Sequence, residues 1–457
     1  KWGDLPASAL LEYQMHEMPP GSSQSLSAGQ HAAIAEHVIQ QAALPEGATL
    51  RLTASDLQSA SDETPDAVEF SGAGSVMDLA RNAGAYTMRS IDDFRTVTTE
   101  ELNNPPQGDW LNWRRTLDGH SHSPLTQISS ENVAGLGLAW SMAMDRGSNQ
   151  PTPLVRDGVM FLTHPNNKIQ AIDAATGDLI WEYQYVFPPA SRMLGGPTRN
   201  IALWQDRLFL ATYDAAIVAI DARTGQQLWR SQKADYQEAF THSAGPIVAN
   251  GIVISGINGC ELFTEAGCFI TGHDPDTGEE LWRTSTLALP GTPEYATWGD
   301  IDPDRRGGGD VWIAGSYDPS SDLIYFGTSQ PKPWAAPSRG MSVDDAALFT
   351  NSTLALRPKT GELVWHFQHV PGETIDMEVG FERILADIDG TPVLLTVGKD
   401  GILWKLNRET GDFRAIKEIP TRNMPTGHLE AVQSEIDLLH NLQHDQIVRY
   451  FEAIRTE

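Results

Sequence analysis

The sequence predicts an all-β fold, a β-propeller in which similar sheets repeat along the chain as blades. The first observation is a repeated motif that ends on Trp181, Trp229, Trp282 and Trp365. The second is its spacing, because the first three of these tryptophans are 48 and 53 residues apart, close to the length of one four-stranded blade. A fifth copy begins at Lys405 and lacks its tryptophan. We therefore expect several blades in succession.

Each copy of the motif is predicted to be a β-hairpin. It has an apolar strand, a Thr-Gly turn in which glycine can adopt positive φ, and a second strand that finishes on the tryptophan. Between the copies, residues 157–158 and 250–251 are Asp-Gly and Asn-Gly pairs that suit two-residue hairpin turns. Residues 313–334 fit a further blade without the tryptophan. We expect about five or six blades between Leu138 and Phe413, whereas a closed propeller needs its last blade to meet its first.

Composition and charge narrow the class of protein. The 457 residues are 40% apolar and 20% charged, which is enough to build a large core. Sixty acidic against 32 basic residues give a net charge of −28, which repels nucleic acid and anionic membrane surfaces. No apolar run approaches the length of a membrane span, and the first residues lack a signal-peptide pattern. A soluble chain with no nucleic-acid partner and no membrane span is expected.

The two flanks differ from the repeat region. Residues 22–43 are predicted to form a helix, because Ser27 and Gln30 fit a capping box and apolar residues recur on one face. Residues 46–105 are polar and are expected to be a linker with some local order. Residues 429–439 carry apolar side chains at helical spacing. Short helical flanks are therefore expected on both sides of the propeller.

Two further motifs, at residues 109–119 and 350–356, accompany the tryptophan repeat in order. Together they make residues 106–413 resemble the methanol and ethanol family of dehydrogenases that depend on pyrroloquinoline quinone (PQQ). The tryptophan repeat alone would predict only a propeller. The resemblance implies an eight-bladed type of propeller, incomplete here, and a periplasmic location. It also implies that PQQ lies flat in a central funnel, above a tryptophan and beside a calcium or lanthanide ion.

The resemblance assigns roles at the PQQ site to individual residues. Trp312 stands where the family has its stacking tryptophan. Lys399 matches the basic residue at the quinone carbonyls, and Arg199 matches an arginine that binds a PQQ carboxylate. Ser243 aligns with a hydroxyl donor, and Asp376 with the catalytic base that accepts the alcohol proton as hydride passes to the quinone. The alternatives left open are an inter-blade tryptophan, a turn lysine, a surface arginine and solvated loop acids.

Candidate metal ligands also follow from the resemblance, and they are Glu261, Gln330, Asp376 and Glu378. Gln330 stands where the family has asparagine, and its extra methylene shifts the reach of the carbonyl oxygen. Glu378 takes the place of an additional acid in lanthanide-using members. Ile375 replaces the tryptophan that usually precedes the catalytic aspartate. These departures change the set of residues expected to bind the metal ion, and the alcohol dehydrogenase activity implied by the resemblance depends on that ion.

Cys260 and Cys268 are the two cysteines of the chain. The adjacent cysteine pair of many alcohol dehydrogenases is missing, and Met193 and Leu194 lie near its place. Two readings remain open. The cysteines form a local disulfide at the funnel mouth, or they are unpaired buried thiols.

Both ends of the chain resemble parts of other families. Residues 1–45 resemble the end of a class I cytochrome c domain, with Met18 at the position of a haem-iron ligand. No Cys-x-x-Cys-His motif occurs, so haem c is expected only in an intact family member. Residues 414–457 resemble strand three, helix C and strand four of a protein kinase, with Lys417 and Glu435 as the ion pair. A plain amphipathic helix is the alternative for this tail, which lacks the other kinase motifs.

Three hypotheses for function follow. The first is PQQ-dependent oxidation of an alcohol to an aldehyde, with electrons passed to a cytochrome c and with weak or absent turnover in a truncated propeller. The second is a non-catalytic propeller scaffold, which has no reason to combine Trp312, Asp376 and Lys399. The third, a fragment of a protein kinase, rests on the tail alone. The combination of the three residues favours the first hypothesis, and the identity of the alcohol is not readable from the sequence.

Overall fold

The computed structural model describes residues 85–87, 89–188, 196–260, 267–342, 344–413, 433–434 and 436–437. The predicted helix at 22–43, the cytochrome-like segment with Met18, and the kinase-like pair Lys417 and Glu435 lie outside these residues. Within the described ranges no helix has the length and apolar character needed to cross a lipid bilayer.

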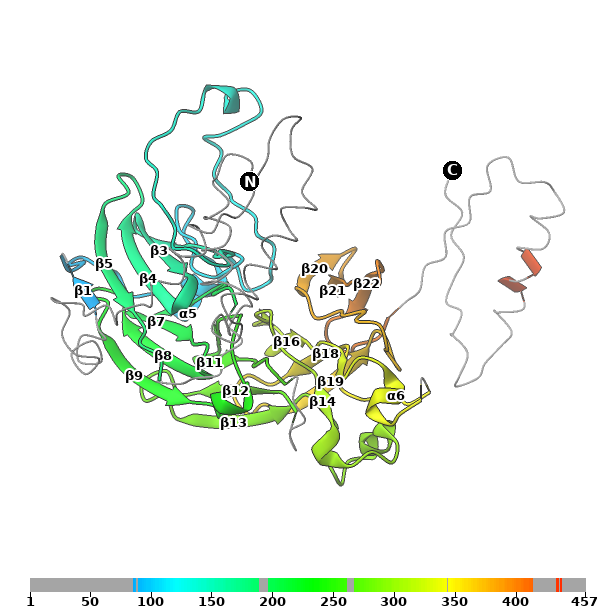
Figure 1. Ribbon diagram of the computed structural model, residues 1–457. Helices are drawn as coiled ribbons and strands as arrows, with labels where there is room; N and C mark the ends of the chain where they lie inside the picture. Colours follow the sequence, from blue (N-terminus) through cyan, green and yellow to red (C-terminus); the bar gives the residue numbers. More distant parts are fainter. Residues whose placement is uncertain are drawn as a thin grey trace, which may run out of the picture. The chain divides into compact units, whose positions relative to one another are not determined.

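Five antiparallel sheets follow one another along the chain, as a propeller requires (Figure 1). We number them as blades in chain order. Blade 1 contains β2 (Leu154–Arg156), β3 (Val159–His164), β4 (Lys168–Asp173) and β5 (Leu179–Gln184). Blade 2 contains β6 (Ala202–Trp204), β7 (Arg207–Ala211), β8 (Ala216–Asp221) and β9 (Gln227–Gln232). Blade 3 contains β10 (Ile247–Ala249), β11 (Ile252–Ser255), β12 (Phe269–His273) and β13 (Glu280–Ser285).

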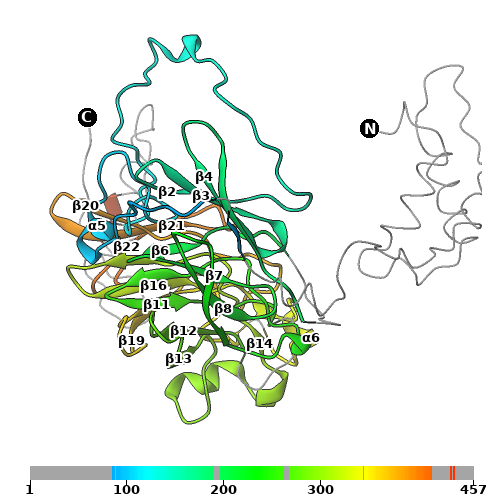
Figure 2. The same cartoon turned by 90° about the vertical axis from the view of Figure 1, so that its left-hand side faces the viewer.

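Blades 4 and 5 complete the series. Blade 4 contains β15 (Ser316–Asp318), β16 (Leu323–Gly327), β18 (Ser352–Leu356) and β19 (Leu363–Gln368). Blade 5 contains three described strands, β20 (Ile384–Ile388), β21 (Thr391–Val397) and β22 (Leu403–Asn407). Figure 2 lets the reader follow strands of successive blades from β2 to β16. The predicted β-propeller class is therefore confirmed.

Short strands and helices lie between or beside the strands of the blades. Strand β1 (Ala85–Thr87) pairs with β5 at the outer edge of blade 1. A two-stranded sheet joins β14 (Gly307–Gly308) to β17 (Pro331–Lys332). Two short α-helices belong to the described ranges, α5 (Thr99–Asn103) and α6 (Ala336–Arg339).

The predicted hairpin turns form as expected. Asp157 and Gly158 between β2 and β3 have φ values of 50° and 79°, and Asn250 and Gly251 between β10 and β11 have 47° and 76°. Two consecutive residues with positive φ are the signature of the turn that matches strand twist in tight hairpins. The position of the motif tryptophan in its strand differs from the prediction, which placed it at the strand end. It is the third residue of its strand, as Trp181 is in β5, and the strand continues for three more residues.

Each motif tryptophan docks on the Thr-Gly turn of the next blade. The indole Nε1 donates to a turn carbonyl in four cases: Trp181 to Ala222 at 3.1 Å, Trp229 to Pro275 at 3.1 Å, Trp282 to Pro358 at 2.9 Å and Trp365 to Arg408 at 3.2 Å. The ring also covers the turn glycine so closely that a Cβ at Gly278 would lie 2.5 Å from the Trp229 ring. Trp140, which the repeat search missed, contacts Ala174 and Gly177 of blade 1 in the same way.

Residues 313–334 do not form a separate blade, and that prediction was wrong. Their strands β15 and β16 pair with β18 and β19, so the stretch is the first half of the blade that carries Trp365. The reason is an insertion with β17 and α6 between the two hairpins of blade 4, which spaces Trp282 and Trp365 by 83 residues.

Residues 97–103 pack on the propeller although the composition of the predicted linker around them is polar. Val97 is fully buried in the main core and forms a β-bridge with Gln205 of blade 2. The following helix α5 begins with a capping box in which Thr98 and Glu101 exchange hydrogen bonds. A few buried residues among many polar ones leave no periodicity to detect in the sequence.

An extended segment, residues 106–121, joins the first blade to the last two. Trp110 pairs with Val155 of blade 1. Further along, the carbonyl of Leu117 accepts from the Tyr317 amide of blade 4 at 2.8 Å, and the carbonyl of Asp118 accepts from the Leu385 amide of blade 5 at 2.8 Å. This segment therefore holds together sheets that are far apart in sequence. It positions blades 4 and 5, which carry much of the candidate site described below.

Buried neutral histidines make the fold sensitive to acid. Burial lowers the pKa of His273 to about 4 and that of His369 to about 2. Both folded-state values lie below the ordinary 6.5, so the unfolded chain binds more protons in acid. We predict that the free energy of unfolding falls as the pH drops below about 6.5, by up to about 1.4 kcal/mol per pH unit for each histidine. Urea unfolding between pH 7 and 5 measures this slope. His369→Gln should flatten it, and the exposed His122→Gln should leave it unchanged.

The tryptophan docking predicts different costs for two glycines with the same backbone conformation. Gly278 and Gly390 have φ values of 77° and 75°, but only Gly278 is covered by a tryptophan, whereas a Cβ at Gly390 would meet nothing within 4 Å. We expect Gly390→Ala to cost about 1 kcal/mol from backbone strain alone. Gly278→Ala should cost a further ~1–3 kcal/mol because Trp229 must move. Equal losses in urea unfolding would show that the docking contact contributes nothing.

Candidate functional site

Trp312 lies on the segment that leads into β15, and its neighbours fix it there. Val311 and Ile313 on either side are buried in the main core, and the Val311 amide donates to the carbonyl of Ile257 at 2.9 Å. The half-buried Trp312 ring meets Phe381 edge-on at 5.2 Å between centroids. The indole is thus held by the buried backbone on either side of it and by packing of its partly buried ring against the main core.

Arg199, ahead of β6, lies over the Trp312 ring with its guanidinium carbon 5.0 Å from the ring centroid. It donates to the carbonyl of Ser243 at 3.1 Å and to Gln150 at 3.0 Å. Burial lowers the pKa of Arg199, and the nearby Glu382 opposes this shift. The structure therefore brings Arg199, Ser243 and Trp312 together, and Arg199 is not an ordinary surface arginine. The structure describes no hydrogen bond of the Ser243 hydroxyl, so the role of this hydroxyl as a donor to the cofactor stays a prediction.

Lys399 joins the two predicted acids of the site. Its ammonium contacts Asp376 Oδ2 at 2.8 Å and Glu378 Oε2 at 2.7 Å. Partial burial works to lower the pKa of Lys399, but the hydrogen bonds to both carboxylates outweigh it and leave the pKa above its ordinary value. The other oxygen of Glu378 accepts from the Trp312 indole at 3.1 Å. The acids are therefore held by specific partners rather than being solvated loop charges.

A continuous set of contacts thus links five predicted residues, from Arg199 through Trp312, Glu378 and Lys399 to Asp376. These residues come from the segments before β6 and β15, the connection between β19 and β20, and the loop after β21. A carboxylate beside a cationic side chain and a flat indole is an arrangement that can accept a proton from a bound hydroxyl group. The sequence analysis assigned every one of these residues individually, but it could not establish that they meet.

Two of the candidate metal ligands have a side-chain oxygen that is buried without a hydrogen-bond partner in the described part of the chain: Asp376 Oδ1 and Gln330 Oε1. Gln330 is only 2% exposed. Such oxygens cost free energy unless they bind something, and carboxylate and amide oxygens are the ligands that calcium and its analogues prefer. Glu261 lies outside the described residues. The donor set that is described therefore fits a hard cation.

Cys260 and Cys268 are bonded to each other, with their Cα atoms 5.6 Å apart, and both are fully buried. Beside them, buried Asp310 accepts hydrogen bonds from the amides of Gly259 and Cys260 at 2.9 and 3.3 Å and from the Ser329 hydroxyl at 3.3 Å. Asp310 thus connects the segments that precede Glu261 and Gln330, and the sequence analysis missed it. The sequence indicates Asp310 only by its position, as an acidic residue two places before Trp312.

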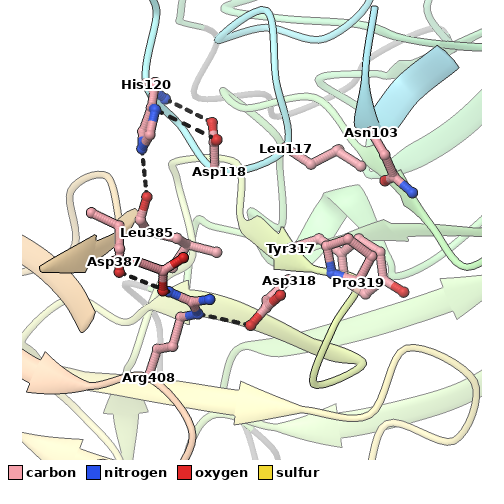
Figure 3. Close-up of a pocket in the computed structure, with 11 residues that line it drawn as sticks. Asn103, Leu117, Asp118, His120, Tyr317, Asp318, Pro319, Leu385, Asp387 and Arg408 are labelled. Atoms are coloured by element: carbon pink, nitrogen blue, oxygen red, sulfur yellow. Dashed lines mark hydrogen bonds and ion pairs between the residues drawn. The ribbon is translucent and has the colours of Figure 1, made fainter. Parts of the chain in front are cut away.

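A separate cavity of about 230 Å³ lies where the 106–121 segment meets blades 4 and 5 (Figure 3). It is lined by Asn103, Leu117, Asp118, His120, Tyr317, Asp318, Pro319, Leu385, Ala386, Asp387 and Arg408. In Figure 3 Arg408 reaches toward two acids, and it contacts Asp318 at 2.8 Å and Asp387 at 2.7 Å. Burial would raise the pKa of Asp318, but hydrogen bonds from Ser320, Arg408 and Ser321 outweigh it and lower the pKa.

This cavity includes none of the predicted site residues. Its charged groups satisfy one another, and the carbonyl of Leu385 accepts a hydrogen bond from Nε2 of the His120 ring at 2.5 Å. We therefore interpret it as an ionic junction between segments. The residues around Trp312 remain the candidate functional site, because they combine a flat ring, paired charges and oxygens without partners.

Comparison with known proteins identifies the family of the propeller. The family described as "PQQ: Glucose/ethanol/alcohol dehydrogenase, beta-propeller domain" matches residues 110–435. Quinohemoprotein alcohol dehydrogenase ADH-IIG of Pseudomonas putida is 36% identical over 363 residues, 74% of this chain and 49% of that protein. The solved structure of ADHIIG from Pseudomonas putida HK5 has a TM-score of 0.64 and 33% identity, and the match covers 72% of this chain and 51% of that one. A europium-containing methanol dehydrogenase has a TM-score of 0.63 and 27% identity, with 69% and 59% covered.

The chain spans about half the length of the curated relatives that it matches. The predicted propeller covers residues 106–413. The matched range starts slightly later, at residue 110, and ends later, at residue 435. It includes all five blades and every described residue of the candidate site. The chain therefore belongs to the family of PQQ-dependent glucose, ethanol and alcohol dehydrogenases, through their β-propeller domain.

Proposed function

We propose that this propeller binds PQQ together with a hard cation and oxidises an alcohol to an aldehyde. The observation that carries the proposal is the contact set around Trp312. It combines the predicted stacking ring, the predicted base Asp376 and the predicted cation Lys399 within one cluster. A non-catalytic scaffold would not require these groups to meet.

The residues fit the chemistry of PQQ, which is a flat tricyclic quinone with carboxylates. The half-buried Trp312 ring suits a planar partner, and the planar guanidinium of Arg199 suits a carboxylate. Bound PQQ supplies an electrophilic carbon that accepts a hydride from the alcohol carbon. Asp376 takes the hydroxyl proton of the alcohol as general base. Lys399 holds Asp376 in place and provides positive charge where the quinone oxygens would gain negative charge.

Gln330, Asp376, Glu378 and Glu261 would hold the cation in this proposal. The unpartnered oxygens of Asp376 and Gln330 support oxygen ligation by two of them. Glu378 adds a second carboxylate within reach of Lys399, and extra negative charge favours a cation of higher charge. The similarity to a europium-containing methanol dehydrogenase supports a lanthanide as the alternative to calcium.

The remaining parts of the proposal concern partners. A cytochrome c accepts the electrons, and a haem c domain and a periplasmic location belong to the proposal through the quinohemoprotein relatives. The substrate is a small alcohol. The kinase-like reading of residues 414–457 and the scaffold reading have no observation in the described residues that favours them.

PQQ binding is expected to depend on Trp312. We predict that PQQ, added with Ca²⁺ or Tb³⁺, binds saturably in a fluorescence titration of the chain. Trp312→Ala should weaken binding on the order of tenfold, because a stacked aromatic pair contributes about 1 kcal/mol beyond its buried area, whereas Trp312→Phe should weaken it less. Trp204→Ala, a half-buried tryptophan of β6, is the control. Absence of saturable PQQ binding with either cation would refute the proposed function.

Cation binding is expected to depend on Gln330 and Asp376. We predict that Gln330→Ala and Asp376→Asn each weaken Tb³⁺ binding by at least roughly tenfold, because even residues that only orient ligands cost about 10- to 100-fold. Terbium luminescence excited through tryptophan measures the affinity. Gln226→Ala, at an exposed turn position, serves as the matched control. Unchanged affinity in both site variants would remove these residues from the cation site.

A further inference from the structure

The backbone around Asp376 is held in an unusual conformation. Asp376 has a φ of 66°, in the left-handed region that few residues other than glycine adopt. Its neighbour Ile375 is 73% exposed, so packing of that side chain does not hold the loop. A residue with this strain persists only when its surroundings determine its conformation. The loop therefore needs another source of restraint.

Glu373 supplies that restraint. Its carboxylate oxygen Oε1 accepts hydrogen bonds from the backbone amides of both Ile375 and Met377, the latter at 2.9 Å. These amides lie directly before and after Asp376, so one oxygen fixes the backbone on both sides of it. Glu373 is 3% exposed, and hydrogen bonds to a buried charged acceptor are stronger than neutral ones.

Glu373 is in turn anchored by Arg339 of helix α6. Arg339 is fully buried and donates to the backbone carbonyl of Glu373 at 3.0 Å. It also donates to the carbonyls of Pro333, at 2.6 Å, and Trp334. Burial lowers the pKa of Arg339, and the negative charge of Glu373 opposes this shift. The insertion of blade 4 is thereby connected to the loop that carries Asp376.

We propose that Glu373 is a positioning residue that holds Asp376 in the conformation required for its role as base and cation ligand. The proposal rests on the proposed function, because it gives Asp376 that role. Glu373 acts through the backbone and does not itself touch the reacting atoms. Its effect on the cation is therefore indirect, through the placement of Asp376 Oδ1, the oxygen that has no partner in the described residues.

Hydrogen exchange and terbium binding test this role together. In Glu373→Ala we expect amide exchange in a peptide covering residues 374–378 to rise about tenfold or more, the factor that corresponds to one charge-assisted hydrogen bond. Peptides from β18 and β19 should keep their protection. The affinity for Tb³⁺ should fall on the order of tenfold. Glu373→Gln retains a side-chain oxygen that can accept both amides, so it should recover most of the protection and most of the affinity.

Controls separate a positioning role from a purely structural one. Glu362 lies in an exposed turn of blade 4, and Glu362→Ala should leave exchange and affinity unchanged. Uniform loss of protection across blade 4, with Glu373→Gln no better than Glu373→Ala, would overturn the proposal, as would unchanged Tb³⁺ affinity in Glu373→Ala. If the unmodified chain binds no Tb³⁺, the proposed function fails. The exchange comparison then still decides whether Glu373 orders the loop around Asp376.

Discussion

The docking of a tryptophan on the glycine of the next blade is the contact on which the rest of this structure depends. Each docking buries an indole, satisfies its N–H with a turn carbonyl and requires a residue without a side chain beneath the ring. Because the same contact recurs between successive blades, it sets the same relation between each pair of sheets. The starts of the innermost strands β6, β10, β15 and β20 therefore come to corresponding places. Much of the candidate site is assembled near these starts: Arg199, Ser243 and Trp312 lie three or four residues before β6, β10 and β15, Asp376 lies eight residues before β20, and Lys399 follows β21.

Charge within the site is balanced locally although the chain as a whole carries −28. Lys399 bridges two carboxylates that would otherwise repel each other, and Arg199 lies over the Trp312 indole. This separates the site into an acidic side, suited to a cation, and a guanidinium side, suited to an anionic ligand.

The sequence was most informative where a residue has a strict geometric requirement. The turn glycines and docking tryptophans recur because no other residue types satisfy the contact, so the blades could be predicted from them. The fourth blade was misjudged because an insertion with α6 lengthened the spacing between Trp282 and Trp365. Asp310 and Glu373 were missed for a different reason. Both act on backbone amides, and any nearby acid in a loop has the same appearance in a sequence.

Three of the predicted differences from the family pattern, at Ile375, Gln330 and Glu378, fall at or beside the proposed cation ligands. In the proposed function, a stacked planar ligand needs a flat ring at one position, and Trp312 is the ring assigned to it. A hard cation accepts six to eight oxygens in flexible geometry, so exchanging an asparagine for Gln330 and adding an acid changes the charge and reach of the ligands without removing an oxygen. The positive φ of Asp376 then gains importance. If Asp376 binds the cation as proposed, its position is set by the hydrogen bonds to Glu373 that fix the backbone on either side of it.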